Sequence, residues 1–374
     1  MNKRLDYLDM AKGIGILLVL IGHLQGESIF QFSPYIQPLC IYIFSFHMPL
    51  FFIITGILIA VKHTDERDFI DVAKGRFKAI MVPYYWFSLF YISIVVVALI
   101  KGEIVFQNLL LNVWYIISGY GMNVLWFLPA LYLGELLFLW LKKKLPSIKS
   151  FLAVIVVSCA VVCVIAYLLT LPDQSVIVYK RFREVVTVII RPVLIAGFIT
   201  IGYYTHVLCE KDNKIATLIS RPELTEDGKI TLKYRLMYIF SGVILMGICL
   251  LFMKVNNGID VRSMALRNIF FFLLCALSGS YGLILICKGL PRMRLVCFWG
   301  TGSLIFMATH NSSQALHYAM LTAMYVNQYL TRARGYICYA IVIAVITLYS
   351  TFMIFIIQRF FPFIIGKSKK KARD

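Results

Sequence analysis

The chain has 374 residues, of which 60% are hydrophobic and only 15% charged, and its mean hydropathy is +0.82. Soluble globular domains hold about a quarter charged residues, so this composition excludes an ordinary soluble protein. The formal net charge of +19 does not indicate a nucleic-acid partner, because the Lys and Arg residues stand between apolar runs and not on one soluble face.

The apolar runs repeatedly reach the ~20 residues that a helix needs to cross a bilayer. We therefore predict an all-α polytopic membrane protein with about ten transmembrane helices. The expected spans are 7–24, 38–61, 80–100, 123–141, 151–171, 185–206, 234–253, 268–287, 295–309 and 336–357. The aromatic segment 101–122, which carries few charges, is expected to dip into the membrane surface.

The distribution of Lys and Arg predicts the orientation. With the N-terminus inside, the cytoplasmic segments hold roughly 27 of these residues and the outer loops roughly 9, as the positive-inside rule requires. Both termini are therefore predicted to be cytoplasmic. Residues 1–366 are expected to form one membrane domain, and residues 367–374 a basic tail that fixes topology and has some affinity for anionic lipid.

Nine cysteines are scattered along the chain, mostly inside apolar runs. Neither a CxxC pair nor a mixed Cys/His spacing typical of zinc occurs, so no disulfide framework and no metal site is expected. The first apolar run also lacks a small-x-small cleavage signal, which argues against a cleaved signal peptide.

The first expected span carries a cation and an imidazole on one face. Lys12 and His23 are 11 positions apart, which brings them within ~20° of the same helical face with ~16 Å of rise between them. The uninterrupted apolar run 13–24 is shorter than the ~20 residues of a span, so polar residues at its ends must lie within membrane depth. Such a helix suits the wall of a water-filled funnel. His23 is either a functional group or a hydrogen-bonded packing residue.

His47 stands in the second expected span, at a depth that could match that of His23. Ionisable groups inside spans are costly and usually face a cavity or one another. Pro49 is expected to loosen the backbone bond one turn earlier and to bend the helix. His47 is therefore either functional or a packing residue at a kink.

Arg191 lies in the middle of the sixth span, and a buried guanidinium needs an anion. Its partner is either a structural carboxylate such as Glu135, the acid within the fourth span, or a substrate. Two further candidates stand at span ends. Arg76, with Lys78, precedes a Pro-Tyr pair at the inner end of the third span and is either a topology marker or a phosphate clamp. His310, at the outer end of the ninth span, is expected to snorkel to the interface.

These residues lie in motifs that together resemble the acyltransferase-3 family of bacterial membrane O-acyltransferases, especially its fucose 4-O-acetylase-like branch. Five motifs in order along the chain carry the resemblance. They are LDMAKGIGILLVLIGH at 8–23, FHMPLFFIITG at 46–56, the basic motif before Pro-Tyr at 76–84, LWFLPAL at 125–131, and the segment 300–310.

The resemblance implies acyl-CoA, commonly acetyl-CoA, as the donor on the cytoplasmic side of a bacterial inner membrane. It implies an acceptor reached from outside, a hydroxyl of a cell-surface or lipid-linked glycan. Some members carry a fused extracytoplasmic domain. Nothing in this chain is long enough to be one, so the protein either completes the transfer itself or passes the acyl group to a separate extracytoplasmic transferase.

The resemblance also implies roles for particular residues. His23 corresponds to a catalytic histidine, acting as general base or transient acyl carrier. Lys12 stands where the family usually has arginine, and it keeps the charge but loses the forked donor. Arg76 matches the first half of a paired-arginine motif, whereas the second half falls on Ala79, with Lys78 beside it.

A mechanism that uses these residues assigns them to three groups. The catalytic candidates are His23 and His47. The candidates for binding the CoA phosphates are Lys12, Arg76 and Lys78. The candidates for contacting the acceptor are Trp126, Glu135, Arg191 and His310.

The rival function belongs to another class, a transporter or flippase of a lipid-linked sugar. It explains Arg191 and Glu135 equally well, but it gives no reason for the fixed spacing between Lys12 and His23. The sequence shows no inverted repeat that would support it. A succinyl rather than an acetyl donor also remains open.

Overall fold

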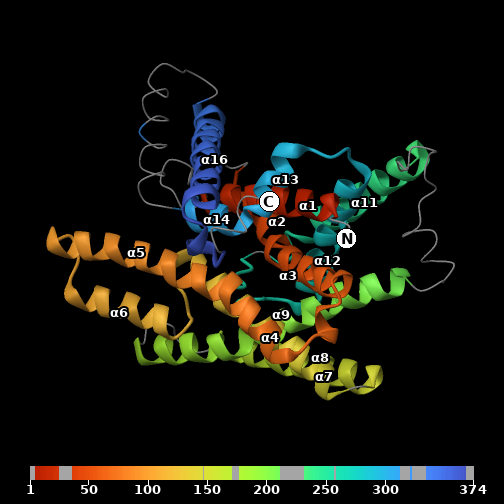
Figure 1. Ribbon diagram of the computed structural model, residues 1–374, viewed down its shortest axis with the longest axis horizontal. Coiled ribbons are helices and arrows are strands. Elements are labelled where there is room, and N and C mark those ends of the chain that lie inside the picture. Colours follow the sequence, from red (N-terminus) through yellow and green to blue (C-terminus); the bar gives the residue numbers. More distant parts are fainter. Residues whose placement is uncertain are drawn as a thin grey trace. The chain divides into compact units, whose positions relative to one another are not determined.

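The computed structural model describes residues 5–24, 36–145, 147–170, 177–210, 231–256, 258–311, 321 and 334–367. This part of the chain is helical, and its one β pairing is an isolated bridge between Asp260 and Ala265. Figure 1 shows the helices in chain order. Their bounds are α1 Asp6–His23, α2 Ile36–Phe44, α3 His47–Val61, α4 Phe69–Arg76, α5 Val82–Ile100, α6 Phe106–Ile117, α7 Phe127–Lys144, α8 Ile148–Leu168, α9 Ile177–Glu210, α11 Leu232–Phe252, α12 Ile269–Gly289, α13 Arg294–Thr301, α14 Ser303–Thr309 and α16 Arg334–Phe360.

Within the described ranges, eight helical segments are long and apolar enough to cross a bilayer. They are Gln37–Val61, Phe69–Ile100, Asn123–Lys144, Ile148–Leu168, Val178–Cys209, Leu232–Phe252, Ile269–Gly289 and Ile337–Phe360. They correspond to eight of the ten predicted spans, and the predicted all-α polytopic membrane protein is confirmed. The other two predicted spans are the 18-residue helix α1 and the ninth, which is split at Gly302 into α13 and α14.

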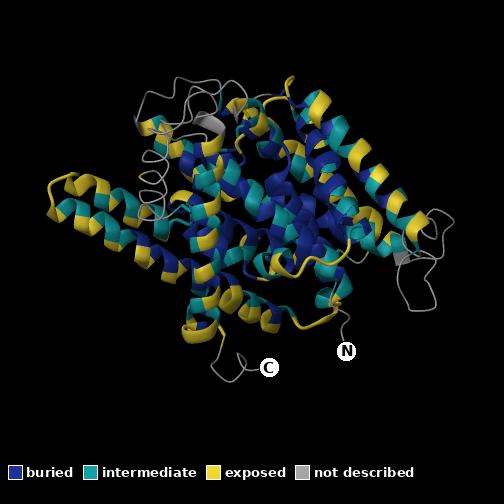
Figure 2. Ribbon diagram, turned by 90° about the horizontal axis from the view of Figure 1, so that it is seen from above, coloured by how far each residue is buried: buried dark blue, intermediate teal, exposed yellow. Residues whose placement is uncertain are grey.

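Large apolar side chains are exposed on several of these helices. Val156 on α8, Leu251 on α11 and Leu348 on α16 are 64%, 73% and 70% exposed. Figure 2 shows such exposed positions in yellow along the helices. Lipid tails are as apolar as these side chains, so a bilayer covers such surfaces without the unfavourable exposure that they would have in water.

The chain divides into two compact units. Unit 1 comprises Met1–Phe51, Leu208–Ile259 and Arg267–Ile356, and unit 2 comprises Phe52–Val207, Asp260–Leu266 and Ile357–Asp374. Unit 1 therefore holds α1, α2, α11 to α14 and most of α16, and unit 2 holds α4 to α8 and most of α9. The two units are described separately below. The predicted basic tail at 367–374 lies outside the described residues except for Lys367.

In unit 1, α1 packs against α13 at two glycines. A Cβ on Gly13 would overlap the carbonyl oxygen of Val296, and one on Gly300 would overlap the backbone of α1. Small residues at such crossings let the backbones of membrane helices approach closely. On its other side, α13 is tied to α16, because Trp299 Nε1 donates a hydrogen bond of 2.8 Å to Thr351 Oγ1.

Also in unit 1, the second predicted span is interrupted between α2 and α3, at residues 45–46. The interruption includes Ser45, whose carbonyl lies one turn before Pro49, a residue without an N–H to bond it. The predicted loosening of the helix is therefore observed, while the predicted bend stays a prediction. Helix α12 supports the break. Ser280 Oγ donates to the carbonyl oxygen of Phe46 at 3.3 Å, and Gly279 leaves room for the Phe46 ring.

In unit 2, the third predicted span begins earlier than expected. Helix α4 continues through a π-helical turn, Phe77–Met81, into α5, so the helical segment starts at Phe69 and not at residue 80. Asp68 caps it, accepting hydrogen bonds from the backbone N–H groups of Ile70 at 2.9 Å and Asp71 at 3.3 Å. The N–H groups of Asp71 and Ile70 hold the pKa of Asp68 below its ordinary value. The basic motif therefore lies within a helix.

Helix α9 contacts α3 at a reciprocal pair of glycines in unit 2. A Cβ on Gly56 would overlap the carbonyl oxygen of Ile199, and one on Gly202 would overlap that of Ile53. The segment expected at the membrane surface contains α6, which is too short to cross a bilayer and lies beside α5. The contact with α3 fixes the position of α9 within unit 2.

Candidate active site

The end of α1 brings together two histidines that are far apart in the sequence. Nε2 of His310 lies 3.3 Å from Nδ1 of His23, and the ring centroids are 5.1 Å apart. His310 is 2% exposed. The expectation that His310 snorkels to the membrane interface is therefore wrong, because α14 runs beside α1 and buries the imidazole there.

The register between α1 and the α13–α14 segment explains this contact. His23 and His310 differ by 287 residues in sequence. Gly13 and Gly300, which meet at the crossing of α1 and α13, differ by the same number. The two segments therefore run in parallel, and each reaches its histidine ten residues after its glycine.

A signal for this pairing was present in the sequence. The segment 13–23 reads GIGILLVLIGH and the segment 300–310 reads GTGSLIFMATH. Both follow the pattern Gly-x-Gly, seven residues, His. This shared spacing is the sequence signal that pairs the two segments.

Hydrogen bonds fix the tautomers of the histidine pair, which is the name used here for His23 and His310. Nδ1 of His310 lies 3.2 Å from the carbonyl oxygen of Phe306. A carbonyl oxygen only accepts, so in neutral His310 Nδ1 carries the proton and Nε2 carries the lone pair. That lone pair accepts from Nδ1–H of His23, which places the lone pair of neutral His23 on Nε2.

His47 lies in the same unit and reaches His23 through one aromatic ring. The Phe44 ring centroid is 6.4 Å from that of His23 and 5.2 Å from that of His47. Nδ1 of His47 lies 2.8 Å from the carbonyl oxygen of Ile43, and the side chain is buried. Among the residues that the structure describes, no three His, Cys, Asp or Glu side chains are grouped to hold a metal ion.

Lys12 lies on α1 with His23, as the helical spacing predicts. Its Nζ is 2.7 Å from Asp9 Oδ1, in a pair whose side chains are 20% and 12% exposed. The α1 cation is thus already partnered by a carboxylate three residues away.

In unit 2, Glu135 is paired with Arg76 and not with Arg191. Nε and Nη2 of Arg76 lie 2.7 Å and 2.6 Å from Oε2 of Glu135, whose side chain is 2% exposed. The alternative of an Arg191–Glu135 ion pair is therefore wrong. The helical extension through α4 brings Arg76 to α7, whereas the sequence predicts a third span that begins only at residue 80. Lys78 follows in the π-helical turn and is exposed.

Arg191 lies instead against aromatic rings. Its guanidinium carbon is 4.9 Å from the centroid of Trp126 and 5.4 Å from that of Tyr120. The residue is 1% exposed, and none of its three side-chain nitrogens has a hydrogen-bond partner among the described residues. Trp126, predicted to contact the acceptor, thus forms a wall beside this buried cation.

Residues 5–214, more than half of the chain, match the family model of the acyltransferase domain, Acyl_transf_3. The chain belongs to the acyltransferase-3 family. The predicted family is therefore confirmed, while its fucose 4-O-acetylase-like branch stays a prediction. The nodulation protein NolL of Mesorhizobium japonicum is 29% identical over 143 residues, which are 36% of this chain and 35% of that protein. This match thus spans about a third of the relative's length. No solved structure matches.

The acyltransferase-3 match extends from α1 to just beyond the end of α9. It includes His23, the Arg76–Glu135 pair and Arg191. His310 lies outside the matched residues, so the histidine pair joins a matched segment to one that the family model does not reach.

Proposed function

We propose that the protein is a membrane O-acyltransferase. It moves an acyl group, acetyl in the first instance, from cytoplasmic acyl-CoA to a hydroxyl of a cell-surface or lipid-linked glycan. Membership of the acyltransferase-3 family supports acyl transfer as the reaction class. The observation that carries the proposal is the hydrogen bond between His23 and His310, because an imidazole with a fixed tautomer presents a defined basic nitrogen.

In the proposed reaction, Nε2 of His23 takes the proton of the acceptor hydroxyl as its oxygen attacks the thioester carbonyl. The new ester C–O bond forms, the C–S bond breaks, and the proton passes from His23 to the departing coenzyme sulfur. His310 accepts the Nδ1–H bond throughout, so it is a positioning residue that holds the ring of His23 in place. A transient acyl group on Nε2 of His23 is the alternative course of the same transfer.

The donor phosphates need cations, and Lys12, Arg76 and Lys78 are the proposed contacts at the predicted cytoplasmic ends of their helices. Arg76 uses Nε and Nη2 for Glu135 and keeps Nη1 for a phosphate oxygen. Lys78 is exposed in the π-helical turn. To bind a phosphate, Lys12 releases the Asp9 carboxylate and pairs with the phosphate oxygen in its place.

The test compares glycans from cells with and without the protein by mass spectrometry and measures CoA release by the purified protein. We expect an ester-linked acyl group that is present only with the protein, and CoA release that increases when glycan is added. Export of an unmodified glycan, with no CoA released, would instead identify the rival transporter function.

A pair of His310 variants tests its positioning role. Gln places its amide oxygen near the position of Nε2 and can accept from His23, whereas Asn reaches only the position of Nδ1. We expect His310→Asn to lower kcat by about 10- to 100-fold, as removing the hydrogen-bond partner of a functional imidazole does at metal sites, with little change in the KM for acyl-CoA.

His310→Gln is expected to retain several-fold more activity than His310→Asn in the same assay, with kcat and KM measured for both. Equal losses in the two variants, accompanied by equal loss of monodisperse protein, would show that His310 only fills space.

A further inference from the structure

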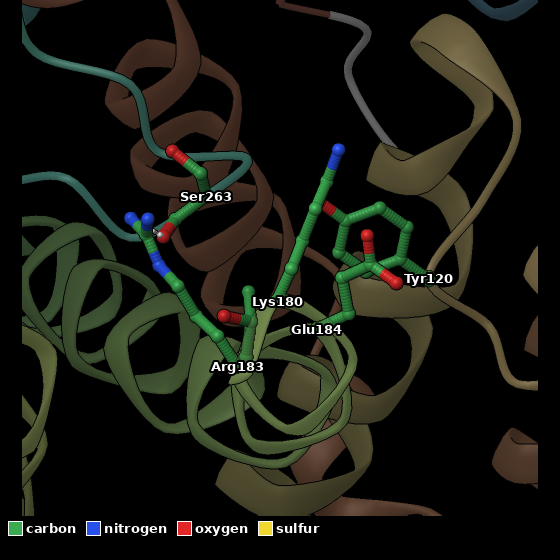
Figure 3. Close-up of a pocket in the computed structure, with 6 residues that line it drawn as sticks. Tyr120, Lys180, Arg183, Glu184 and Ser263 are labelled. Atoms are coloured by element: carbon green, nitrogen blue, oxygen red, sulfur yellow. Dashed lines mark hydrogen bonds between the residues drawn. The ribbon is translucent and has the colours of Figure 1, made fainter. Parts of the chain in front are cut away.

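A polar cavity lies in unit 2 at the N-terminal half of α9. It encloses about 270 Å³ and is lined by Tyr120, Lys180, Arg183, Glu184, Thr187 and Ser263. Figure 3 shows Arg183 beside Ser263 and Glu184 beside Tyr120, with Lys180 between them. None of these six residues was singled out by the sequence analysis.

Arg191 lies on the same face of α9 as three of the cavity residues. Lys180, Glu184, Thr187 and Arg191 follow one another at intervals of three or four residues, so they share a face of the helix. Tyr120 lines the cavity and also lies 5.4 Å from the Arg191 guanidinium. Arg191 therefore stands one turn beyond the cavity's Thr187, beside the same aromatic ring.

The donors of Arg191 are unused. The rings of Trp126 and Tyr120 stabilise its charge through their faces, but its N–H groups have no hydrogen-bond acceptor among the described residues. A guanidinium remains charged in proteins, and a buried charge is normally paired. Glu184, the acidic residue that lines the cavity, is not the partner of Arg191. Its carboxylate accepts from Tyr115 Oη at 3.0 Å and from Arg181 Nη1 at 2.6 Å.

A second guanidinium faces the same ring. The Arg262 guanidinium carbon is 5.5 Å from the Tyr120 centroid, and its buried Nε has no hydrogen-bond partner among the described residues. The nearby Asp260 carboxylate is used locally, accepting from the N–H of Arg262 at 2.9 Å and from Ser263 Oγ at 2.6 Å. Burial raises the pKa of Tyr120, so this hydroxyl stays protonated and supplies no negative charge.

Positive charge therefore predominates around the cavity. The charged groups named here are Lys180, Arg181, Arg183, Arg191 and Arg262 against Glu184 and Asp260, an excess of three positive charges. All three side-chain nitrogens of Arg191 and Nε of Arg262 are unused among the described residues, while Nη2 of Arg262 donates to the carbonyl oxygen of Gly121 at 3.4 Å. Beside a cavity that admits a small polar group, the fork of Arg191 matches the geometry of a carboxylate or phosphate, and Arg262 adds a further donor and charge.

We propose that Arg191 and Arg262, with Lys180 and Arg183 at the cavity, form an oxyanion-binding site for the acceptor. The ligand is the carboxylate of an acidic sugar or the phosphate of a sugar phosphate, which share this chemistry. The assignment to the acceptor rests on the proposed function. It follows from the predicted orientation, in which the N-terminal half of α9 faces outward, away from the cytoplasmic donor.

Binding is measured by isothermal titration calorimetry on the purified full-length protein. The probes are glucuronic acid, glucose 1-phosphate and the neutral methyl glucoside. We expect at least one anionic probe to bind, the neutral probe to bind at least tenfold more weakly, and the affinity to fall as salt is added. The two anionic probes distinguish a carboxylate ligand from a phosphate ligand. Failure of both to bind would overturn the proposal.

Arg191→Met is expected to abolish the binding of the anionic probe and to leave the apparent unfolding temperature of the ligand-free protein equal or higher, because the unpaired charge is removed. Arg191→Lys, which keeps the charge but not the fork, is expected to bind at least tenfold more weakly than wild type. Lys101→Gln removes an exposed charge elsewhere in unit 2 and serves as the control.

Two results would contradict the proposal: unchanged probe binding in Arg191→Met, or a large fall in its unfolding temperature with binding retained in Arg191→Lys. Unchanged binding in Arg191→Met would show that Arg191 does not contact the anion. A large fall in unfolding temperature with binding retained in Arg191→Lys would show that Arg191 serves only to stabilise the fold. His23→Ala separates this proposal from the proposed function, because it is expected to stop acyl transfer while anionic probes still bind.

Discussion

His23→Ala is expected to lower kcat for acyl transfer by about 10²- to 10⁴-fold, the usual contribution of a general base. The KM for acyl-CoA should change little, because the variant keeps the proposed phosphate contacts. His23 stands at the end of α1 and is only half-buried, so its loss should leave folded, monodisperse protein. The measurement is single-turnover transfer from labelled acetyl-CoA to glycan.

His63→Asn is the matched control for this variant. His63 is an exposed loop histidine with φ 48°, a backbone conformation that Asn tolerates, and its replacement should leave transfer unchanged. Imidazole added to His23→Ala is expected to restore part of the rate by supplying the missing base. Full activity in His23→Ala without imidazole would remove His23 from the chemistry and make His47 the next candidate.

Hydropathy predicted most of the fold because crossing a bilayer constrains composition so strongly. Hydropathy did not predict the helical segments that carry many charged residues. Residues 69–79 contain enough charged side chains to resemble a loop, yet Asp68 begins a helix there by capping its N–H groups. The ninth span was predicted as one helix because Gly302 is a weak signal against an otherwise apolar run.

The candidate site was predictable to the extent that it is local. Lys12 and His23 share a helix, so their common face follows from spacing alone. His310 was misplaced because its burial depends on α1, a partner 287 residues away. The surroundings of Arg191 and Glu135 are likewise tertiary, because composition cannot say which of several buried charges meet: Glu135 pairs with Arg76, whereas Arg191 lies against the rings of Trp126 and Tyr120. That choice is made by the packing of α4, α7 and α9.

Variants of Arg76 and Glu135 distinguish the contribution of this ion pair to stability from that of Arg76 to donor binding. Arg76→Met leaves the Glu135 carboxylate buried without its cation, and breaking a buried pair costs about 3–5 kcal/mol. Arg76 is 33% exposed, so we expect the lower end, about 3 kcal/mol of stability lost. Glu135→Gln should cost less, because the partly exposed guanidinium that it leaves behind can be solvated.

The double variant Arg76→Met with Glu135→Gln is expected to recover most of this stability, because no uncompensated charge remains buried. Arg76→Met is expected to raise the KM for acyl-CoA about tenfold, and the double variant should keep this raised KM. Glu135→Gln alone should leave the KM near the wild-type value. The measurements are thermal unfolding and steady-state kinetics on all four proteins. If the double variant regained a wild-type KM together with its stability, Arg76 would be a structural partner of Glu135 with no part in holding the donor phosphates.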